Sequence, residues 1–264
     1  MTAMATLPET PYYRATGGEV ALFETCFERR LPLLLKGPTG CGKSRFVEHM
    51  AAALNRPLIT VACHDDTTAT DLLGRYLIRG DETVWCDGPV ARAVREGAIL
   101  YLDEIAEARP DVVVVVHPLT DHRRELFLER HDEVLRAGPE FMVVASYNPF
   151  YQRGLKELKP STRQRFVCLS FQYPAPAVER EILMGETGID AATAKKLVAL
   201  AGKLRQAEML GIAEVPSTRL LVDAAYLLSA GLPPRLACRT AIVEALTDDH
   251  ETIKAMCDIV ALCF

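Results

Sequence analysis

The chain has 264 residues, of which 49% are hydrophobic and 25% are charged, and its formal net charge is −5. This composition excludes a mainly disordered protein, which would be less apolar and would carry more net charge. It also provides no overall basic field for holding nucleic acid or an anionic membrane surface, so neither is expected as a partner.

Export and membrane insertion are not indicated by the sequence. Residues 1–14 lack the apolar core of a signal peptide, and no apolar run approaches the ~20 residues that a membrane-spanning helix needs. The eight cysteines include no C-x-x-C pair, so a zinc ribbon or a dithiol redox motif is not expected. We therefore predict a cytoplasmic protein with reduced thiols.

Five short apolar runs alternate with longer helix-like segments through the first two-thirds of the chain. Each run is apolar on both faces, which is typical of a buried parallel strand, and the intervening segments are long enough for crossover helices. The alternative, that some runs are pieces of buried helix, fits less well with their short length. The runs span residues 33–35, 58–61, 99–102, 141–145 and 166–169. We predict a doubly wound α/β domain.

The last third of the chain contains no strand candidate. Leu, Ala, Ile and Val recur there at three- and four-residue spacing, which predicts amphipathic helices. The expected helices span residues 177–186, 191–207, 217–230, 233–246 and about 248–262. The sequence YPAP at 173–176 would break a helix, so we place the domain boundary there. The prediction is an α/β domain over 1–175 and a smaller all-helical domain over 176–264.

The segment after the first predicted strand fits the pattern G-x-x-x-x-G-K-[ST] of a phosphate-binding loop, and a helix-like stretch at 44–54 follows it as the motif requires. Its glycines let the backbone turn N–H groups toward an anion, and the next helix adds the positive end of its dipole. An ordinary glycine-rich turn is the alternative. The predicted nucleotide-binding residues are Gly37, Pro38, Thr39, Gly40, Cys41, Gly42, Lys43 and Ser44.

Two carboxylates follow the predicted strand at 99–102, about sixty residues after the phosphate-binding loop. Asp103 is placed to hold Mg²⁺ together with Ser44, while Lys43 can reach the β- and γ-phosphates of ATP. Glu104 points to the other side of the strand and could orient or deprotonate the attacking water. The alternative for both residues is a solvated strand end.

Asn148 ends the next predicted strand, at the same edge of a parallel sheet. There it could hydrogen-bond the γ-phosphate or the attacking water. A turn-forming asparagine before a proline is common, however, and position alone does not choose between the two interpretations.

These residues resemble those of the AAA+ ATPases, and more narrowly those of the MoxR branch and its CbbQ/NirQ/NorQ group. The resemblance runs over nearly the whole chain. It is carried by the sequences KGPTGCGK (36–43), PLITVACHDD (57–66), DGP (87–89), YLDE (101–104), SYNP (146–149), KPSTRQRF (159–166) and STRL (217–220). The group's fold implies a sheet of five parallel strands in the order 5-1-4-3-2 and a helical lid domain.

The resemblance also implies roles for individual residues. Lys43 and Ser44 would belong to the Walker A motif, Asp103 and Glu104 to Walker B, and Asn148 to sensor 1. 

Three arginines would complete the nucleotide site. Arg165 matches the arginine finger, with Arg163 as the second candidate, and Arg219 looks like sensor 2. Arginine suits these positions because its planar guanidinium can meet the charge that develops on a transferred phosphoryl group. Without the resemblance, all three would be interpreted as surface charges.

Two further segments fit the MoxR pattern as hairpin insertions. Residues 67–97 contain two β-like arms around a polar glycine turn, and the only tryptophan, Trp85, lies on one arm. Residues 119–138 match the position of the hairpin before sensor 1. Both could instead be plain surface loops.

The resemblance implies an ATPase of the AAA+ chaperone type that forms a homo-oligomeric ring, expected to be a hexamer, and uses ATP and Mg²⁺ to remodel a client protein. The implied client is rubisco blocked by sugar phosphates, reached through a CbbO-like adaptor with a von Willebrand factor A domain. Maturation of nitric oxide or nitrite reductase is the alternative. Two alternative functions belong to other classes of protein. One is a monomeric P-loop small-molecule kinase, and the other is a nucleic-acid motor, which the acidic charge balance disfavours.

Overall fold

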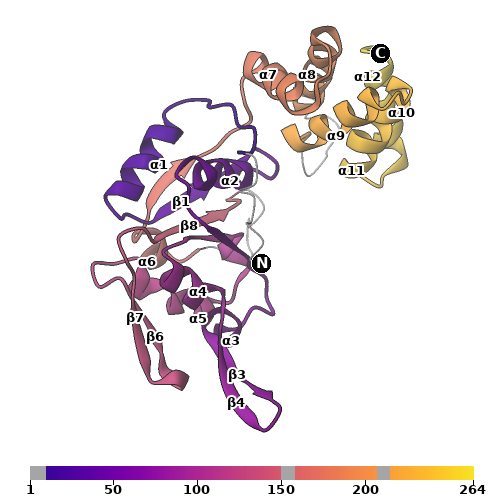
Figure 1. Ribbon diagram of the computed structural model, residues 1–264. Coiled ribbons are helices and arrows are strands. Elements are labelled where there is room, and N and C mark those ends of the chain that lie inside the picture. The colour runs from indigo at the N-terminus through magenta and orange to yellow at the C-terminus, as the bar shows by residue number, and fades with distance from the viewer. Residues whose placement is uncertain (1–9, 150–157, 207–214) are drawn as a thin grey trace, which may run out of the picture. The chain divides into compact units, whose positions relative to one another are not determined.

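The computed structural model describes residues 10–149, 158–206 and 215–264, and it contains a parallel sheet of five strands (Figure 1). The strands are β1 (Leu33–Lys36), β2 (Leu58–Ala62), β5 (Ile99–Asp103), β8 (Met142–Tyr147) and β9 (Val167–Ser170). They lie in the order β2-β5-β8-β1-β9, which is 5-1-4-3-2 when these five strands are numbered along the chain. The predicted α/β fold and the implied strand order are confirmed.

The burial of each strand follows its place in the sheet. All six residues of β8 are buried, and so are the first four of β5, because both strands have neighbours on either side. The edge strands β2 and β9 are only partly buried. Since the strands run parallel, β1, β5 and β8 end at the same edge of the sheet, where Lys36 pairs with Tyr147 and Leu102 with Ala145. Buried parallel strands of this kind explain the apolar runs of the sequence.

Short helices accompany the sheet. Phe46 of α2 packs edge-on against Phe23 of α1 with ring centroids 5.5 Å apart, and it also contacts Phe171 at 5.4 Å. These rings join two helices to the last strand of the sheet. The helices are α1 (Glu19–Glu28), α2 (Lys43–Ala53), α3 (Ala69–Leu73), α4 (Pro89–Glu96), α5 (Pro110–Val115) and α6 (Pro160–Arg163).

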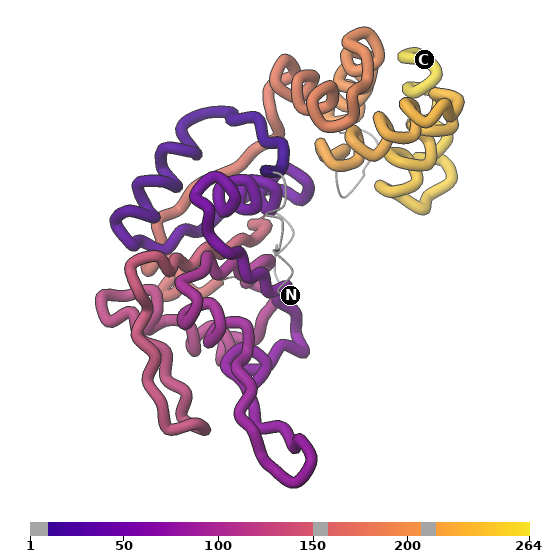
Figure 2. The backbone as a smooth tube through the Cα atoms, in the orientation of Figure 1, coloured from indigo at the N-terminus to yellow at the C-terminus, as the bar shows by residue number. Residues whose placement is uncertain are grey.

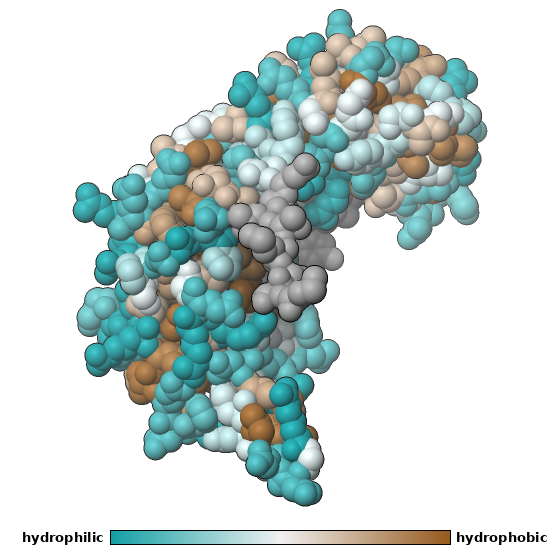
Figure 3. Space-filling view, viewed as in Figure 1, coloured by the Kyte–Doolittle hydropathy of each residue, from teal (hydrophilic) through white to brown (hydrophobic). Residues whose placement is uncertain are grey.

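Two antiparallel hairpins extend from this part of the chain (Figure 2). The first pairs β3 (Gly74–Arg79) with β4 (Glu82–Asp87), and the second pairs β6 (Glu125–Leu128) with β7 (Glu133–Arg136). They lie within the segments 67–97 and 119–138 of the sequence. On the first hairpin Ile78 is 81% exposed and Leu77 is 37% exposed, and the surface in Figure 3 includes hydrophobic atoms at the end where this hairpin projects.

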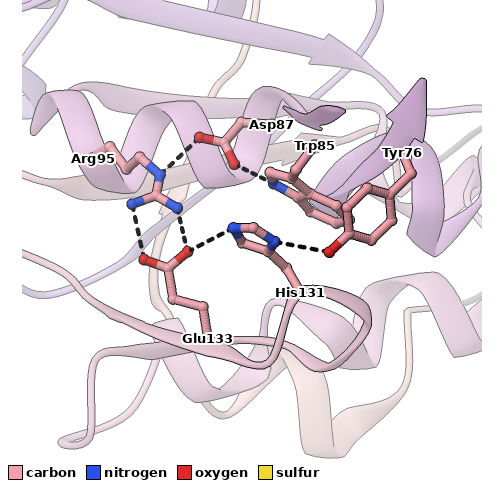
Figure 4. Close-up of polar contacts among 6 residues, drawn as sticks. All are labelled: Tyr76, Trp85, Asp87, Arg95, His131 and Glu133. Atoms are coloured by element: carbon pink, nitrogen blue, oxygen red, sulfur yellow. Dashed lines mark hydrogen bonds and ion pairs between the residues drawn. The ribbon is translucent and has the colours of Figure 1, made fainter. Parts of the chain in front are cut away.

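A network of polar and aromatic contacts, here called the hairpin network, links the two hairpins (Figure 4). The imidazole of His131 stacks on the indole of Trp85 at 4.8 Å, and its Nδ1 lies 3.1 Å from the hydroxyl of Tyr76. Arg95 of α4 donates to Glu133 through both terminal nitrogens and to Asp87 at 2.7 Å. The network consists of Tyr76, Trp85, Asp87, Arg95, His131 and Glu133.

Contacts along the chain separate two compact units. The first contains Gly17–Pro38 and Lys43–Phe171, and the second contains Gln172–Phe264 together with two short earlier segments, Tyr12–Thr16 and Thr39–Gly42. The expected boundary at 175/176 lies close to this division. Each unit has its own buried apolar cluster.

The described part of Gln172–Phe264 is helical. Its helices are α7 (Pro176–Thr187), α8 (Ala191–Gln206), α9 (Thr218–Ser229), α10 (Pro234–Cys238), α11 (Glu244–Leu246) and α12 (His250–Ala261). The helix expected over 233–246 is interrupted by a π-helical segment, Arg239–Val243, between α10 and α11. No helix in the described residues combines the length and apolar character needed to cross a membrane.

Tyr12–Thr16 packs against α7 within the second unit, and we call it the N-terminal strap. Arg14 Nε pairs with Glu181 at 2.6 Å, and the Tyr12 hydroxyl donates to the carbonyl of Glu181 at 3.4 Å. A Cβ added at Gly185 would lie 2.3 Å from the Tyr12 ring, so a glycine is required for this close approach.

Candidate functional site

The phosphate-binding loop connects β1 to α2 and requires glycine at specific places. A Cβ added at Gly37 would lie 2.6 Å from the carbonyl oxygen of Phe171, so no side chain fits there. Gly40 and Gly42 have φ values of +69° and +97°, in the left-handed region that favours glycine. The sequence motif thus forms the tight turn expected of it.

Lys43, the first residue of α2, is folded back onto this loop. Its ammonium donates to the carbonyl oxygens of Gly37 at 2.9 Å and Pro38 at 3.0 Å, and its side chain is buried. Two of the three N–H groups of the ammonium are therefore engaged, and the third is available for an anion held by the loop. Of the other predicted loop residues, Cys41 is buried and Thr39 is exposed.

Four side chains converge where α2 meets β5 and β8, and we call them the inner network: Ser44, Tyr101, Asp103 and Ser146. Asp103 Oδ1 accepts from the Ser146 hydroxyl at 2.6 Å and from the Tyr101 hydroxyl at 2.7 Å. Ser44 Oγ lies 3.1 Å from the Tyr101 hydroxyl and donates to Asp103 Oδ2 at 3.4 Å. The two predicted metal ligands, Ser44 and Asp103, are thus neighbours.

Glu104 departs from the strand geometry. Its φ of +51° and ψ of +48° are left-handed, a conformation that is uncommon for residues other than glycine and that is often found at functional sites. Its backbone N–H donates to Ser146 Oγ at 3.2 Å, which holds the turn. Burial raises the pKa of the Glu104 carboxyl, while the positive charge of Lys43 opposes this shift. A carboxylate with a raised pKa is a stronger base than an exposed one.

Asn148 lies beside Glu104, as the position of both residues at one sheet edge predicts. It follows β8 directly and is buried. The backbone N–H of Asn148 donates a hydrogen bond to the Glu104 carboxylate, which lowers the pKa of that carboxyl. The structure therefore brings Lys43, Ser44, Asp103, Glu104 and Asn148 together.

The two candidate finger arginines differ in their surroundings. Arg165 is half-buried and its Nη1 donates to Asp121 Oδ2 at 3.2 Å, whereas its buried Nε has no partner among the described residues. Arg163, at the end of α6, is exposed and has no side-chain partner in the described part of the chain. Neither arginine hydrogen-bonds to Ser44, Asp103 or Glu104.

Arg219 belongs to the second unit, where it is the second residue of α9. Ser217 caps this helix by accepting from the backbone N–H of Leu220, and buried Glu179 accepts from Thr218 at 2.7 Å. Within the same unit, a Cβ added at Gly40 would lie 3.2 Å from the Arg219 Cβ. The start of α9 is therefore held next to the tip of the phosphate-binding loop.

The donor set at Ser44 and Asp103 suits Mg²⁺ better than a softer metal. One hydroxyl and one carboxylate offer hard oxygen ligands, and Mg²⁺ is usually held by few protein ligands because it keeps several waters. Among the described residues no group of three or more His, Cys, Asp or Glu side chains forms a metal site. None of the eight cysteines, all in described ranges, is in a disulfide.

Sequence reasoning missed three residues of this region: Tyr101, Ser146 and Asp121. In the sequence, Tyr101 belongs to an apolar strand and to the motif YLDE, and Ser146 belongs to the motif SYNP, but neither pattern assigns a role to the hydroxyl. The available signal was spacing, because residues two apart on a strand share a face. Tyr101 therefore shares a face with Asp103, and Ser146 with Asn148.

Two family comparisons cover most of the chain. Residues 32–166 match the AAA domain of the dynein-related subfamily. Residues 179–263 match the CbbQ/NirQ/NorQ C-terminal family. The first match contains the loop, the two carboxylates and both finger candidates, and the second contains Arg219.

Three relatives are similar over nearly their full length. The chain is 58% identical to the denitrification regulatory protein NirQ of Pseudomonas aeruginosa, over 96% of this chain and 97% of the relative. It is 56% identical to the protein NorQ of Paracoccus denitrificans, over 97% of this chain and 95% of the relative. It is 55% identical to the protein CbbQ of Hydrogenophilus thermoluteolus, over 91% of this chain and 90% of the relative.

A solved structure shares the fold. A RuvB mutant of Thermotoga maritima superposes with a TM-score of 0.55 over 91% of this chain and 68% of that chain. The sequence identity is 15%, so this likeness bears on the fold alone.

Proposed function

The chain belongs to the CbbQ/NirQ/NorQ group of AAA+ ATPases, and from that premise we propose that it is a ring-forming motor that hydrolyses ATP to remodel a client protein. One observation carries the proposal. Lys43, Ser44, Asp103 and Glu104 are assembled at one sheet edge, yet no arginine of the described residues bonds to them. In the proposed ring, a neighbouring subunit would supply this arginine.

The loop residues would bind the nucleotide. Backbone N–H groups from Gly37 to Gly42 and the start of α2 would surround the phosphates, and Lys43 would give its remaining N–H to the β- and γ-phosphates. Ser44 and Asp103 would hold Mg²⁺, the second one through water. When bound, this ion neutralises charge on the phosphate oxygens.

Glu104 would act as the base for the attacking water. Its raised pKa makes it a better proton acceptor, and its left-handed backbone turns it away from the line of β5 toward Asn148. Asn148 would hydrogen-bond the γ-phosphate or the same water. Arg219 would serve as sensor 2, and it lies near Gly40 within the second unit.

The arginine that meets the γ-phosphate would come from the next subunit of a ring, which we propose to be a hexamer. Arg165 is the first candidate and would have to leave Asp121, but an ion pair of this exposure contributes under about 1 kcal/mol. Arg163 is the second candidate and is already unengaged among the described contacts. An arginine finger accelerates phosphoryl transfer by a factor on the order of 10³ or more.

The test mixes two inactive variants. Arg165→Ala and Glu104→Gln subunits should each be nearly inactive alone, and a mixture should regain ATP turnover because intact sites form between unlike neighbours. The same mixture with Arg163→Ala in place of Arg165→Ala identifies which arginine acts. Mass in solution, with and without ATP, measures the ring. Full turnover by a strictly monomeric chain would refute the proposal and favour a P-loop enzyme acting alone, such as a small-molecule kinase.

The client is proposed from the relatives. The resemblance to CbbQ favours rubisco blocked by sugar phosphates, reached in the cytoplasm through an adaptor with a von Willebrand factor A domain. The resemblance to NirQ, a denitrification regulatory protein, favours nitric oxide or nitrite reductase. The three similarities are nearly equal in strength, so identity does not rank these clients.

One experiment separates the clients. Purified protein, its adaptor and ATP are added either to inhibited rubisco or to inactive nitric oxide reductase, and recovery of each enzyme's activity is measured. Glu104→Gln protein serves as the control because it should bind ATP without hydrolysing it. If the activity of only one enzyme recovers, that enzyme is the client. If neither activity recovers, neither enzyme is the client.

A further inference from the structure

The hydroxyl of Tyr101 lies between the two proposed metal ligands. It is at 2.7 Å from Asp103 Oδ1 and 3.1 Å from Ser44 Oγ, while the tyrosine itself is almost fully buried in the middle of the sheet. Tyr101 and Asp103 are two residues apart on β5 and therefore share a face. Ser44 comes from a different element, the start of α2, so this hydroxyl links the strand to the helix, at a shorter distance than the 3.4 Å between Ser44 Oγ and Asp103 Oδ2.

The protons of this cluster can be assigned by counting donors. Asp103 Oδ1 accepts hydrogen bonds from the hydroxyls of Tyr101 and Ser146. A phenol has one proton, so toward Ser44 the Tyr101 oxygen acts as the acceptor. Ser146 donates a hydrogen bond to Asp103 Oδ1 and accepts one from the Glu104 N–H. Its Oγ also lies 3.1 Å from the Tyr101 hydroxyl, but the Tyr101 proton has its shorter contact, 2.7 Å, with Asp103 Oδ1.

This arrangement has a consequence for Ser44. A serine oxygen that offers a lone pair to a cation must aim its own proton elsewhere, and the nearest described acceptor is the Tyr101 oxygen at 3.1 Å rather than Asp103 Oδ2 at 3.4 Å. When the Ser44 hydroxyl donates its hydrogen bond to the Tyr101 oxygen, the lone pairs of Ser44 Oγ are free to bind a cation. Since Asp103 Oδ1 is occupied by two donors, Oδ2 is the carboxylate oxygen left for a metal or its water.

We propose that Tyr101 is a positioning residue of the magnesium site, which orients Ser44 and Asp103 at once through a relay from the Ser44 hydroxyl to the Tyr101 hydroxyl to Asp103 Oδ1. The inference rests on the proposed function, because it assumes that the loop binds ATP with Mg²⁺. Phenylalanine would fill the same space in the sheet but could not form either bond.

The test measures binding rather than turnover. A fluorescent ATP analogue is titrated first in EDTA and then at increasing Mg²⁺, and the Mg²⁺ concentration for half of the affinity gain is recorded. For Tyr101→Phe we expect this concentration to rise about 10-fold, the effect of losing a hydrogen bond to a charged network. The affinity in EDTA should stay within about twofold of the wild type, since the loop and Lys43 are untouched.

Tyr147→Phe is the matched control. Tyr147 is also a buried tyrosine of the sheet, on β8, but no described hydrogen bond joins its hydroxyl to the inner network. It should leave the Mg²⁺ dependence unchanged. A uniform loss of affinity with and without Mg²⁺ in Tyr101→Phe, or a wild-type Mg²⁺ dependence, would contradict the positioning role.

A second replacement covers the case in which Tyr101→Phe does not fold. Incorporating 3-fluorotyrosine at position 101 keeps the hydroxyl and the shape of the ring but makes the oxygen a weaker acceptor. It should shift the Mg²⁺ dependence in the same direction by a smaller factor, and no shift would contradict the relay. If the wild type itself gains no affinity from Mg²⁺, or does not bind the nucleotide, the proposed function fails first.

Discussion

The inner network and the hairpin network are both built from hydrogen bonds among side chains far apart in sequence, yet they differ in burial. Tyr101 and Ser146 of the inner network are buried in the sheet. The hairpin network is partly exposed and depends on ion pairs, such as Arg95 with Asp87 and Glu133. A buried polar group left without a partner costs far more than an exposed one, because water can replace a partner only at the surface.

Because of this difference in burial, the two networks should differ in how well they tolerate the loss of a hydrogen bond. The inner network can keep one arrangement only, which suits groups that must meet a nucleotide in fixed geometry. The hairpin network can lose a contact and re-form, because water can take the place of a lost partner at the surface. The substitutions below test whether burial separates the two networks as argued.

The largest effect is expected at the edge of the inner network. Glu104→Gln removes the proposed base and should lower kcat for ATP hydrolysis by roughly 10²–10⁴. Nucleotide affinity should remain near that of the wild type, because Lys43 and the loop do not change. Phosphate release and equilibrium binding measure the two quantities. A variant that hydrolyses ATP normally would show that Glu104 is not the base.

Ser146→Ala tests the burial argument on stability. The change leaves the Glu104 N–H without its acceptor and removes one of two donors from Asp103 Oδ1. We expect unfolding free energy to fall by about 1–3 kcal/mol in a denaturant titration. Ser170→Ala, at the exposed end of β9, is the control and should stay within about 0.5 kcal/mol. Equal effects for both serines would remove the distinction.

His131→Ala tests the hairpin network in the same way. It removes the stack on Trp85 and the contact with Tyr76, but the gap lies at the surface. The expected loss is about 0.5–1 kcal/mol, less than for Ser146→Ala. Trp85 is the only tryptophan of the chain, so its emission reports the change directly. An unchanged emission spectrum would mean that the stack is absent in solution.

The smallest effect is expected at Asp121 and depends on pH. Hydrogen bonds from Arg123 and then from Arg165 hold the pKa of the Asp121 carboxyl below its ordinary value of 3.8. A lowered pKa stabilises the fold above the ordinary value, and this contribution is lost as pH falls below it. Asp121→Asn should therefore lower Tm at pH 7 by at most about 2–4 °C, and by less at pH 3. A Tm difference that grows in acid would contradict the assignment.

The sheet could be predicted from the sequence because its central strands are apolar on both faces, as at 99–102 and 141–145, and this pattern survives without knowledge of any neighbour. The C-terminal helices were predicted less fully. The segment 233–246 contains the π-helical turn Arg239–Val243, and one extra residue in a turn leaves little trace in a pattern of three- and four-residue spacing.

The candidate site also contains some residues that the sequence predicts and others that it does not. Asp103 and Glu104 are recognisable because a motif places them at a strand end. The role of Tyr101 depends on Ser44, 57 residues earlier, and the partner of Arg165 is Asp121, 44 residues away. Pairings of this kind are set by the register of the sheet and by where helices begin, so a linear pattern does not contain them.

The N-terminal strap affects how the protein can be handled. Because Tyr12 and Arg14 contact Gly185 and Glu181 of α7, a fragment that starts at residue 172 would expose the face of α7 that these residues cover. A tag fused next to the strap, or a deletion of the first sixteen residues, therefore changes the surroundings of a helix that is remote in sequence. The helical unit is therefore best studied with residues 12–16 present and free of fusions.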